Sequence, residues 1–520
     1  MKNNNPNSLK IGVMSDVHLS IENKENYKRA EKIFNLFKEH NVDAIINCGD
    51  TSDTYNIELI QQYCELFYNT FKDQEEKPEK LWIAAGHDVL GAPDKDLAYQ
   101  EVATTFNSGG LNFVKEIKGY TFIGISQGQD LAILEEYLEK HYQGSLKPTF
   151  VLTHEPPQNT VFSSSHFIYE KLRKILNNYP RVINISGHTH APVFLDKNLW
   201  QGEFTAINAG SLFYWKDRPL GAPSRIINSC DAIIFEIQEN QIVIHRFNML
   251  TNQEIDPDNL WTLPIPYVKE NALYTPQMRK ASFPIPQFSS KEATIKFDQE
   301  PFSHAYIKYP SITPISAFHN IRVELLEEQD GNFNKIALFD YCNNYLYDDK
   351  EMFEIPVGLL KSNCNYKAIL TPMNIYEKTG SSINIEFTTP VCKLEELVIK
   401  NLITIKREDG KFYTLSDGVF ETTKEFEVVH IVLPQELQQY RNFNLATVIE
   451  FECSHTGNPA ILMAYGTKPD WGRHFFPNGV VAKQRHSFLL NHLSGDNFSI
   501  FLGEGSPGKY KIHQIKYYKY

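Results

Sequence analysis

The pattern of hydrophobic and polar positions divides the chain into two halves with different secondary structure. In the first 265 residues, short apolar runs alternate with segments of helical spacing, in which residues such as Ile33, Phe34 and Phe37 share one face. The predicted strands are Leu9–Met14, Ala44–Asn47, Leu81–Ala85, Phe122–Ser126, Phe150–Thr153, Val182–Ser186, Ala232–Ile237 and Ile242–Phe247, and the predicted helices are Tyr27–His40, Ile57–Phe71, Leu131–His141 and Phe167–Asn178. Strands that alternate with helices indicate α/β layers around a largely parallel sheet.

The second half is predicted to be almost entirely β. The stretch Leu263–Phe288 contains five prolines and predicts an extended linker. Beyond it, helical patterns nearly vanish and short segments of alternating hydrophobicity appear, with a spacing that favours two all-β sandwich domains. We therefore expect a multi-domain chain divided into an α/β domain (1–265), a Pro-rich linker (266–289) and two β-sandwiches (290–389 and 390–520).

Composition and charge narrow the class of protein. Hydrophobic residues make up 42% of the chain and charged residues 22%, as in ordinary globular proteins. The net charge is −12, and residues 1–265 alone carry 24 basic against 34 acidic side chains. No part has the basic excess that binds a nucleic-acid backbone, so we expect no nucleic-acid scaffold as partner.

Cysteine usage and apolar runs bear on the compartment. The seven cysteines are odd in number and form no CxxC pair, which favours reduced, buried thiols over a disulfide framework. We find no signal-peptide pattern and no apolar run long enough to span a membrane. We therefore expect a cytoplasmic protein, or an extracellular one if a leader has been removed.

Five short polar segments of the first domain each follow a predicted strand. In open α/β sheets the carboxyl ends of the strands are where ligands bind. The segments are Asp16-Val17-His18, Gly49-Asp50-Thr51-Ser52-Asp53, Gly86-His87-Asp88, His154-Glu155 and Gly187-His188-Thr189-His190. Any one of them alone has an ordinary structural explanation, such as a turn, but their joint occurrence in this order favours a metal centre.

The donor count predicts two metal ions. Carboxylate and imidazole ligands suit Zn, Mn or Fe. Six candidates are too many for one tetrahedral ion, but they suit two ions that share a carboxylate. These candidates are Asp16, His18, Asp50, His154, His188 and His190. We expect the Asp16/His18 and His188/His190 pairs on extended backbone, where residues i and i+2 point the same way.

The set of motifs DxH, GDxxD, GHD, THE and GHTH resembles the calcineurin-like metallophosphoesterase superfamily over residues 9–250. The resemblance implies a four-layer αββα sandwich with a binuclear metal centre. It also implies a role for each residue: Asp16, His18 and His190 bind the first metal, Asp50 bridges, His154 and His188 bind the second, His87 faces the substrate, Asp88 orients His87, and Asp53 accepts a hydrogen bond from a ligand histidine.

The third motif departs from the family pattern. The family has Gly-Asn-His-Asp/Glu, and its Asn ligates the second metal, whereas this chain has Gly86 at the Asn position. Glycine offers no ligand atom. Either water fills the vacancy and the second metal binds more weakly, or another polar residue such as Asn47 or Asn208 fills it, or catalysis is impaired.

The resemblance implies hydrolysis of a small phosphate ester. A metal-bound hydroxide would attack phosphorus while His87 protonates the leaving group. The run into GHTH is similar to bacterial cyclic-nucleotide phosphodiesterases, so a phosphodiester is the first expectation. The alternatives are a phosphomonoesterase or nucleotidase, or a non-catalytic binding protein with a degenerate metal site because of Gly86.

The remaining candidates stay open at the level of sequence. The segment Asn208–Ser211 is either the family's closing turn or a plain turn, and Tyr214, Trp215 and Arg218 either contact a base or sugar or pack internally. The first β-sandwich resembles fibronectin type III, with a Tyr near the start of its penultimate strand, and the second resembles a carbohydrate-binding jelly roll. The Trp471–Phe475 segment could present an aromatic ring to a sugar, or the modules could serve contacts within the protein.

Overall fold

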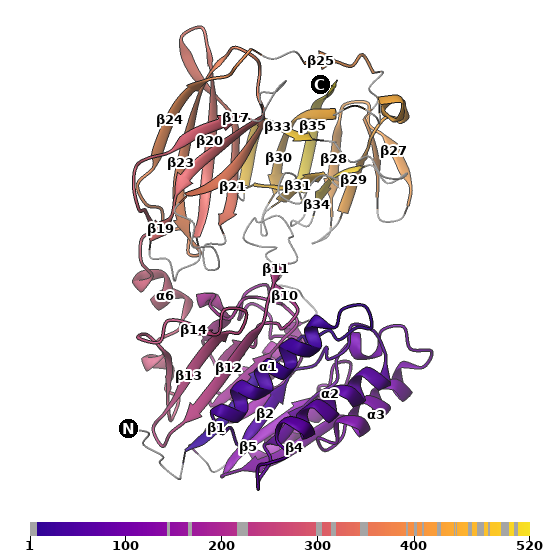
Figure 1. The fold of residues 1–520 in the computed structure, drawn as a ribbon, viewed down its shortest axis with the longest axis vertical. Coiled ribbons are helices and arrows are strands. Elements are labelled where there is room, and N and C mark those ends of the chain that lie inside the picture. The colour runs from indigo at the N-terminus through magenta and orange to yellow at the C-terminus, as the bar shows by residue number, and fades with distance from the viewer. Residues whose placement is uncertain are drawn as a thin grey trace. The chain divides into compact units, whose positions relative to one another are not determined.

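We describe a computed structural model of the 520-residue chain (Figure 1). The residues described are 8–142, 146–164, 169–215, 227–297, 304–313, 319–343, 352–391, 394–399, 403–407, 410–423, 428–440, 443, 445–455, 460–464, 473–476, 479–489, 499–503 and 508–519. They form two compact units, the first ending at Ser282 and the second beginning at Phe283.

The first unit is an α/β structure with two mixed sheets. Its elements are β1 (Leu9–Met14), α1 (Glu25–Glu39), β2 (Ala44–Asn47), α2 (Ile57–Thr70), β3 (Glu79–Trp82), α3 (Lys95–Phe106), β4 (Asn112–Ile117), β5 (Tyr120–Ile125), α4 (Ala132–His141), β6 (Thr149–Leu152), α5 (Glu170–Leu176), β7 (Val182–Ser186), β8 (Leu199–Gln201), β9 (Thr205–Asn208), β10 (Tyr214–Trp215), β11 (Ile227–Asn228), β12 (Asp231–Ile237), β13 (Gln241–Asn248), β14 (Gln253–Glu254), β15 (Trp261–Pro264) and α6 (Pro276–Ser282). One sheet has the order β14-β13-β12-β1-β2-β3 with β15 on β13, and the other β4-β5-β6-β7-β9-β8. The strands β1, β2 and β3 run parallel in the first sheet, as do β5, β6, β7 and β9 in the second.

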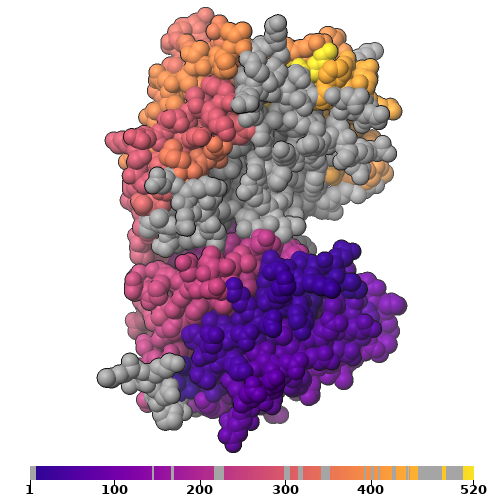
Figure 2. Space-filling model, viewed as in Figure 1, coloured from indigo at the N-terminus to yellow at the C-terminus, as the bar shows by residue number. Residues whose placement is uncertain are grey.

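The two sheets pack face to face, with helices on both outer faces. Alternate residues of β1, such as Ile11 and Val13, share one buried core with Phe122 and Phe150 of the opposite sheet. The other face of the first sheet packs under α1, α2 and α3, and the other face of the second packs under α4 and α5. This is the helix–sheet–sheet–helix order of layers expected for the first domain. In Figure 2 the indigo and purple residues, which include the α1–α3 layer, form a large part of the visible face of the first unit, beside its pink residues.

Most of the predicted elements of this unit are present. The strands β1, β2 and β7 have the predicted bounds, and the helices α1, α2 and α4 differ from theirs by one or two residues. The helix α3 was missed because its buried residues include two alanines, Ala98 and Ala103, which give only a weak apolar period. The predicted helix Phe167–Asn178 is represented by α5, and residues 165–168 lie outside the described part.

The second unit is built from strands. They are β16 (Gln287–Phe288), β17 (Thr294–Phe297), β18 (His304–Pro310), β19 (Ile312–Thr313), β20 (His319–Gln329), β21 (Asn332–Asn343), β22 (Met352–Leu359), β23 (Asn365–Asn374), β24 (Ile383–Thr388), β25 (Glu395–Glu396), β26 (Thr404–Lys406), β27 (Phe412–Thr414), β28 (Val419–Thr422), β29 (Val428–Val432), β30 (Leu445–His455), β31 (Ala460–Ala464), β32 (Arg473–Phe476), β33 (Gly479–Leu489), β34 (Ser499–Gly503) and β35 (Gly508–Lys519). A ten-stranded sheet in the order β24-β23-β20-β21-β32-β31-β34-β29-β26-β27 runs through both predicted sandwiches, joined where Asp340 pairs with Phe475.

Two separate cores lie in this unit, each between the ten-stranded sheet and a smaller one. One gathers residues of β18, β20, β22 and β23, including Tyr366, and the other gathers residues of β29, β30 and β35. The Tyr366 hydroxyl accepts a hydrogen bond from the backbone N–H of Lys361 (3.0 Å), a contact typical of the tyrosine corner of β-sandwiches. The likeness of these regions to fibronectin type III and jelly-roll modules stays a prediction.

The predicted linker 266–289 is not extended throughout, because it contains the helix α6. The boundary between the two compact units, at Ser282, falls inside this predicted linker. The predicted domain limits stay predictions. Of the predicted aromatic loop, Trp471 lies outside the described residues. No helix within the described ranges is long and apolar enough to cross a bilayer. The cysteines whose side chains are described are free thiols.

Candidate metal centre

The predicted ligands lie where the carboxyl ends of the two sheets meet. Asp16 and His18 follow β1 and Asp50 follows β2, while His154 follows β6 and the His188/His190 pair follows β7. Backbone hydrogen bonds join these loops: the N–H of Asp16 donates to Gly49 O (3.1 Å) and that of His18 to Asp50 O (3.0 Å). Across the sheets, the N–H of His188 donates to the Asp16 carboxylate (3.0 Å).

The backbone at the ligands is left-handed, which corrects the expectation of extended pairs. Positive φ angles occur at five of the six predicted ligands: 54° at Asp16, 48° at His18, 53° at Asp50, 68° at His188 and 51° at His190. Residues other than glycine rarely adopt this backbone region, although Asp and His tolerate it better than most. Such strain persists only where the surroundings hold it, and it concentrates at functional sites.

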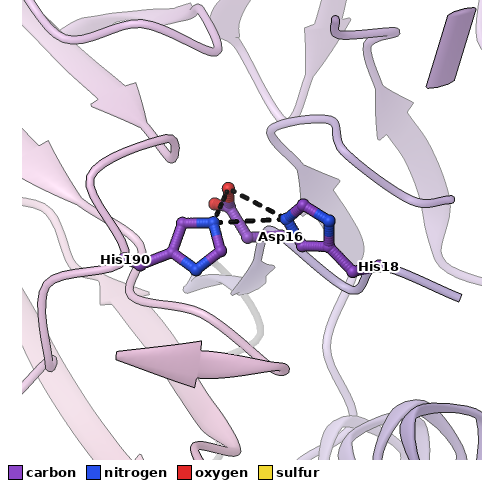
Figure 3. Close-up of side chains that lie close together, drawn as sticks. All are labelled: Asp16, His18 and His190. Atoms are coloured by element: carbon purple, nitrogen blue, oxygen red, sulfur yellow. Dashed lines mark hydrogen bonds and ion pairs between the residues drawn. The ribbon is translucent and has the colours of Figure 1, made fainter. Parts of the chain in front are cut away.

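The first group of ligand atoms is formed by Asp16, His18 and His190 (Figure 3). Nε2 of His190 lies 3.0 Å from Asp16 Oδ1, and Nε2 of His18 lies 4.0 Å from the same oxygen. The two Nε2 atoms are 3.2 Å apart. All three side chains are buried.

The second group is formed by Asp16, Asp50 and His154, with His188 beside it. Nε2 of His154 lies 3.1 Å from Asp50 Oδ2 and 3.3 Å from Nδ1 of His188. Asp50 Oδ2 is also 3.9 Å from Nε2 of His18, so this carboxylate lies between the two groups.

The hydrogen bonds on the far side of the imidazoles test whether these residues fit a metal. Nδ1–H of His190 donates to Tyr214 O (2.9 Å), and Nδ1–H of His154 donates to Cys48 O (2.8 Å). A carbonyl only accepts, so each neutral ring turns the lone pair of Nε2 toward a carboxylate. Lone pairs and carboxylates that converge need a cation between them, and this outer hydrogen bonding is typical of metal-ligating histidines. The donor set therefore fits divalent metal ions.

The electrostatics of the metal-free site show the same need for positive charge. Burial alone would raise the pKa of Asp16 and Asp50, but the neighbouring His190 and His154 hold both pKa values below the ordinary carboxyl value. Burial alone would lower the pKa of His154, yet the Asp50 carboxylate raises it to about 10. In the absence of metal, a proton on His154 therefore takes the place of a cation.

His87 stands at the rim of the site with its side chain 43% exposed. Its Nδ1–H donates to the carbonyl oxygen of Asp53 (2.8 Å) and lies 3.6 Å from Asp53 Oδ1. The same Oδ1 lies 3.0 Å from Nδ1 of His18, which is the contact expected of an acceptor for a ligand histidine. Asp53 therefore touches both a predicted ligand and the predicted general acid.

The expected role of Asp88 in orienting His87 is corrected by the contacts of its carboxylate. Asp88 Oδ1 accepts from the backbone N–H of Thr51 (2.8 Å) and Ser52 (2.9 Å), and Oδ2 accepts from Ala85 N–H (2.9 Å). Burial, followed by the charge of Asp50, raises the pKa of Asp88 to about 6. Asp88 thus holds the loop that carries Asp50, and His87 is oriented by Asp53.

The space beside Gly86 holds a residue that the sequence did not indicate. Oε1 of Gln127 accepts from the N–H of Gly86 at 2.6 Å. The two expected candidates are engaged elsewhere: the amide of Asn47 bonds Thr51 and Tyr63, and that of Asn208 bonds Gly187 O. The only sequence signal for Gln127 was its place directly after the predicted strand Phe122–Ser126.

The turn Asn208–Ser211, after β9, contacts the loop that carries Asp16. Ser211 Oγ donates to Asp16 O (3.2 Å), so the Asn208–Ser211 turn supports the backbone of one predicted ligand. Phe213 and Tyr214 are partly exposed, and the Phe213 ring centroid is 5.6 Å from that of His18. Trp215 is buried and donates to Asp231, so it packs internally, and Arg218 lies outside the described residues.

The fold and site define a metal-dependent phosphoesterase. Residues 9–192 match the family described as calcineurin-like phosphoesterase, and they form a calcineurin-like phosphoesterase domain. A probable cyclic nucleotide phosphodiesterase of Coxiella burnetii is 29% identical over 205 residues, covering 35% of this chain and 77% of the relative.

Solved structures that resemble this chain are far more distant in sequence. A dimetal phosphatase from Danio rerio is 10% identical, with a TM-score of 0.33, covering 50% of this chain and 99% of its own. A purple acid phosphatase from yellow lupin seeds is also 10% identical, with a TM-score of 0.36, covering 52% of this chain and 56% of its own.

Proposed function

We propose that the first unit hydrolyses a small phosphodiester of the cyclic-nucleotide kind, with His87 as general acid. The observation that carries the proposal is the position of His87: half-exposed, at the rim of a buried cluster of carboxylates and imidazoles, with one ring nitrogen fixed. The description of the Coxiella burnetii relative as a probable cyclic nucleotide phosphodiesterase supports the choice of a cyclic nucleotide.

The six predicted ligands would hold two divalent cations. Asp16, His18 and His190 would bind one of them; Asp50 would lie between the two, with His154 and His188 on the other. When bound, such cations neutralise phosphoryl oxygens and lower the pKa of a water molecule. The chain's own contribution is to hold the imidazole lone pairs toward the cations through Cys48 O, Tyr214 O and the Asp53 carboxylate.

His87 would supply the proton to the leaving oxygen. Because its Nδ1–H is held by Asp53 O, the proton to be transferred lies on Nε2, the other ring nitrogen. An imidazolium in this place has two hydrogen-bond donors, one for orientation and one for the substrate.

Hydrolysis of model esters tests the proposal. The purified chain is stripped with chelator, reloaded with Mn²⁺, and assayed on bis-p-nitrophenyl phosphate, p-nitrophenyl phosphate and a 3′,5′-cyclic nucleotide. We expect Mn²⁺-dependent turnover of the diesters. Loss of the general acid in His87→Ala should lower kcat on the order of 10²-fold or more. A matched control is His141→Ala, a partly exposed histidine at the end of α4, which should leave kcat unchanged.

The substrates separate the alternatives. Faster turnover of p-nitrophenyl phosphate than of either diester would make the protein a phosphomonoesterase and contradict the diester proposal. An equal loss of kcat in His87→Ala and His141→Ala would contradict the role of His87 as general acid. Absence of turnover on all three substrates in the Mn²⁺-loaded protein would contradict the proposal as a whole.

A further inference from the structure

Gly86 is not required by its backbone conformation. Its φ of −64° and ψ of −37° are those of an ordinary right-handed residue, which any side chain adopts. What limits the position is space, because a Cβ built there would lie 3.0 Å from Oε1 of Gln127. A side chain at position 86 and the Gln127 amide would therefore compete for the same space.

Gln127 is fixed beside Gly86 by the packing of two chain segments. The residues after β3 and those after β5 run side by side: Ala84 N–H donates to Ser126 Oγ (3.1 Å), and Gln127 N–H donates to Ala84 O (3.0 Å). This pairing joins the ends of one strand from each sheet. These contacts fix the backbone of Gln127 independently of the contacts that its side chain makes.

The orientation of the Gln127 amide follows from its two partners. Nε2 donates to the Glu155 carboxylate (2.9 Å), and Oε1 accepts from Gly86 N–H. The reverse assignment would bring the NH₂ group against a backbone N–H and the carbonyl against a carboxylate. Glu155 itself directly follows His154, a predicted ligand, so the amide is held from the ligand loop.

The amide oxygen is held against Gly86, whose chain neighbour His87 contacts Asp50 of the second group, and it has unused hydrogen-bonding capacity. The N–H of His87, the residue after Gly86, donates to Asp50 Oδ1 (3.0 Å). A carbonyl oxygen has two lone pairs, and the Gly86 hydrogen bond uses one of them. Amide oxygens are accepted ligands of divalent cations such as Mn²⁺.

We propose that Gln127 takes the place of the side chain missing at Gly86 and supplies the amide oxygen to the cation held by Asp50, His154 and His188. The inference rests on the proposed function only in assuming the same two-cation site. In place of the water, Asn47 or Asn208 considered from the sequence, it puts a ligand delivered from the opposite sheet.

Mn²⁺ binding tests the inference without reference to turnover. Stoichiometry and the two dissociation constants are measured by equilibrium dialysis with metal analysis on the full chain. The wild-type protein should bind two Mn²⁺. Gln127→Ala should weaken one of the two sites about tenfold or more and leave the other unchanged. The matched control is Gln129→Ala, two residues along the same loop, whose side chain contacts Asn112.

A double variant distinguishes a lost ligand from a loosened loop. Gly86→Asn combined with Gln127→Ala removes one amide and supplies another in the cleared space, so it should restore the weakened site. Gly86→Asn alone should change little, because two amides then compete for one place. Coupling of this kind between two neighbouring positions is what a double-mutant cycle measures.

The outcomes divide cleanly. Unchanged affinities in Gln127→Ala, failure of the double variant to restore binding, or a single Mn²⁺ in the wild-type protein would each overturn the inference. If the predicted affinity changes occur but no ester is hydrolysed, the proposed function fails and the role of Gln127 stands.

Discussion

The hydroxyl of Tyr169 lies 2.8 Å from Nε2 of His188. That contact occupies one ring nitrogen of His188 and turns the other, Nδ1, toward Nε2 of His154 at 3.3 Å. Tyr169 is buried at the start of α5, so a helix of the outer layer fixes the direction of a predicted ligand.

Removing this hydroxyl should therefore weaken metal binding without unfolding the chain. In Tyr169→Phe we expect affinity for one Mn²⁺ to fall about tenfold, the low end of such outer-contact effects. Mn²⁺ titration measures it, with thermal unfolding as a check on the fold. The control Tyr137→Phe alters a partly buried tyrosine on α4 and should leave the titration unchanged. A fall of equal size in both variants would contradict the role of Tyr169.

Asp53 and His87 should have separable effects. Asp53→Ala removes the carboxylate from Nδ1 of His18 but leaves the carbonyl oxygen that orients His87. We expect it to weaken one Mn²⁺ site by roughly 10- to 100-fold, with kcat largely recovered at saturating metal. His87→Ala should do the opposite, with metal binding unchanged and kcat reduced. Parallel titrations and kinetics on both variants decide, and a persistent loss of kcat in saturated Asp53→Ala would argue against the separation.

The sequence pattern predicted which residues gather at the candidate site. It did not predict which neighbouring residues orient them. The six predicted ligands could be expected to lie together because each follows an apolar strand, and parallel strands bring their carboxyl ends to one edge. Gln127 and Tyr169 could not, since their positions depend on how the β5 end and the start of α5 pack against the other sheet and its loops. The role of Asp88 was misassigned because adjacency to His87 in sequence says nothing about where its carboxylate points.

The same limit applies to the second half of the chain. Period-two hydrophobicity predicted strands and two cores, both of which depend on local pattern. The single ten-stranded sheet depends on the pairing of β21 with β32, which are far apart in sequence and carry no local signal for each other. Partner choice between strands is a tertiary property, so the boundary between the two predicted sandwiches could not be read from the pattern.

Tyr366 should anchor the first of these cores. Its ring is fully buried, and its hydroxyl accepts the backbone N–H of Lys361. Tyr366→Phe leaves that N–H without its acceptor, which should cost about 1–3 kcal/mol in the free energy of unfolding of the second unit. Urea denaturation followed by circular dichroism measures the change. Tyr413→Phe, at a 40% exposed tyrosine of β27, is the control and should shift the transition little.

Asp231 should make the metal-free protein less stable as the pH rises through the weakly acidic range. Burial raises its pKa to about 7, although Trp215 Nε1–H (2.6 Å) and Val193 N–H donate to its carboxylate. Between about pH 4 and 7 the folded state keeps a proton that the unfolded state has lost, so this group reduces stability by about 1.4 kcal/mol per pH unit. Asp231→Asn should flatten that slope in urea unfolding at pH 5, 6 and 7. Parallel slopes in the two proteins would show that Asp231 is ionised throughout.

Metal affinity should rise with pH, because His154 must lose a proton to become a ligand. The Asp50 carboxylate, 3.1 Å from Nε2, raises the pKa of His154 to about 10 in spite of its burial. Below that pH the metal-free protein carries the proton on His154, and a cation must displace it. The apparent affinity for Mn²⁺ should therefore increase about tenfold per pH unit up to pH 10 and level off above it.

Two measurements check this dependence. Dissociation constants at pH 6.5, 7.5 and 8.5 give the slope, and calorimetric titration in buffers of different ionisation enthalpy counts the protons released on binding. We expect release of at least one proton per chain at pH 7.5. Binding that is independent of pH, with no proton released, would mean that His154 is already neutral in the metal-free site, and that its lone pair faces the Asp50 carboxylate without a proton between them.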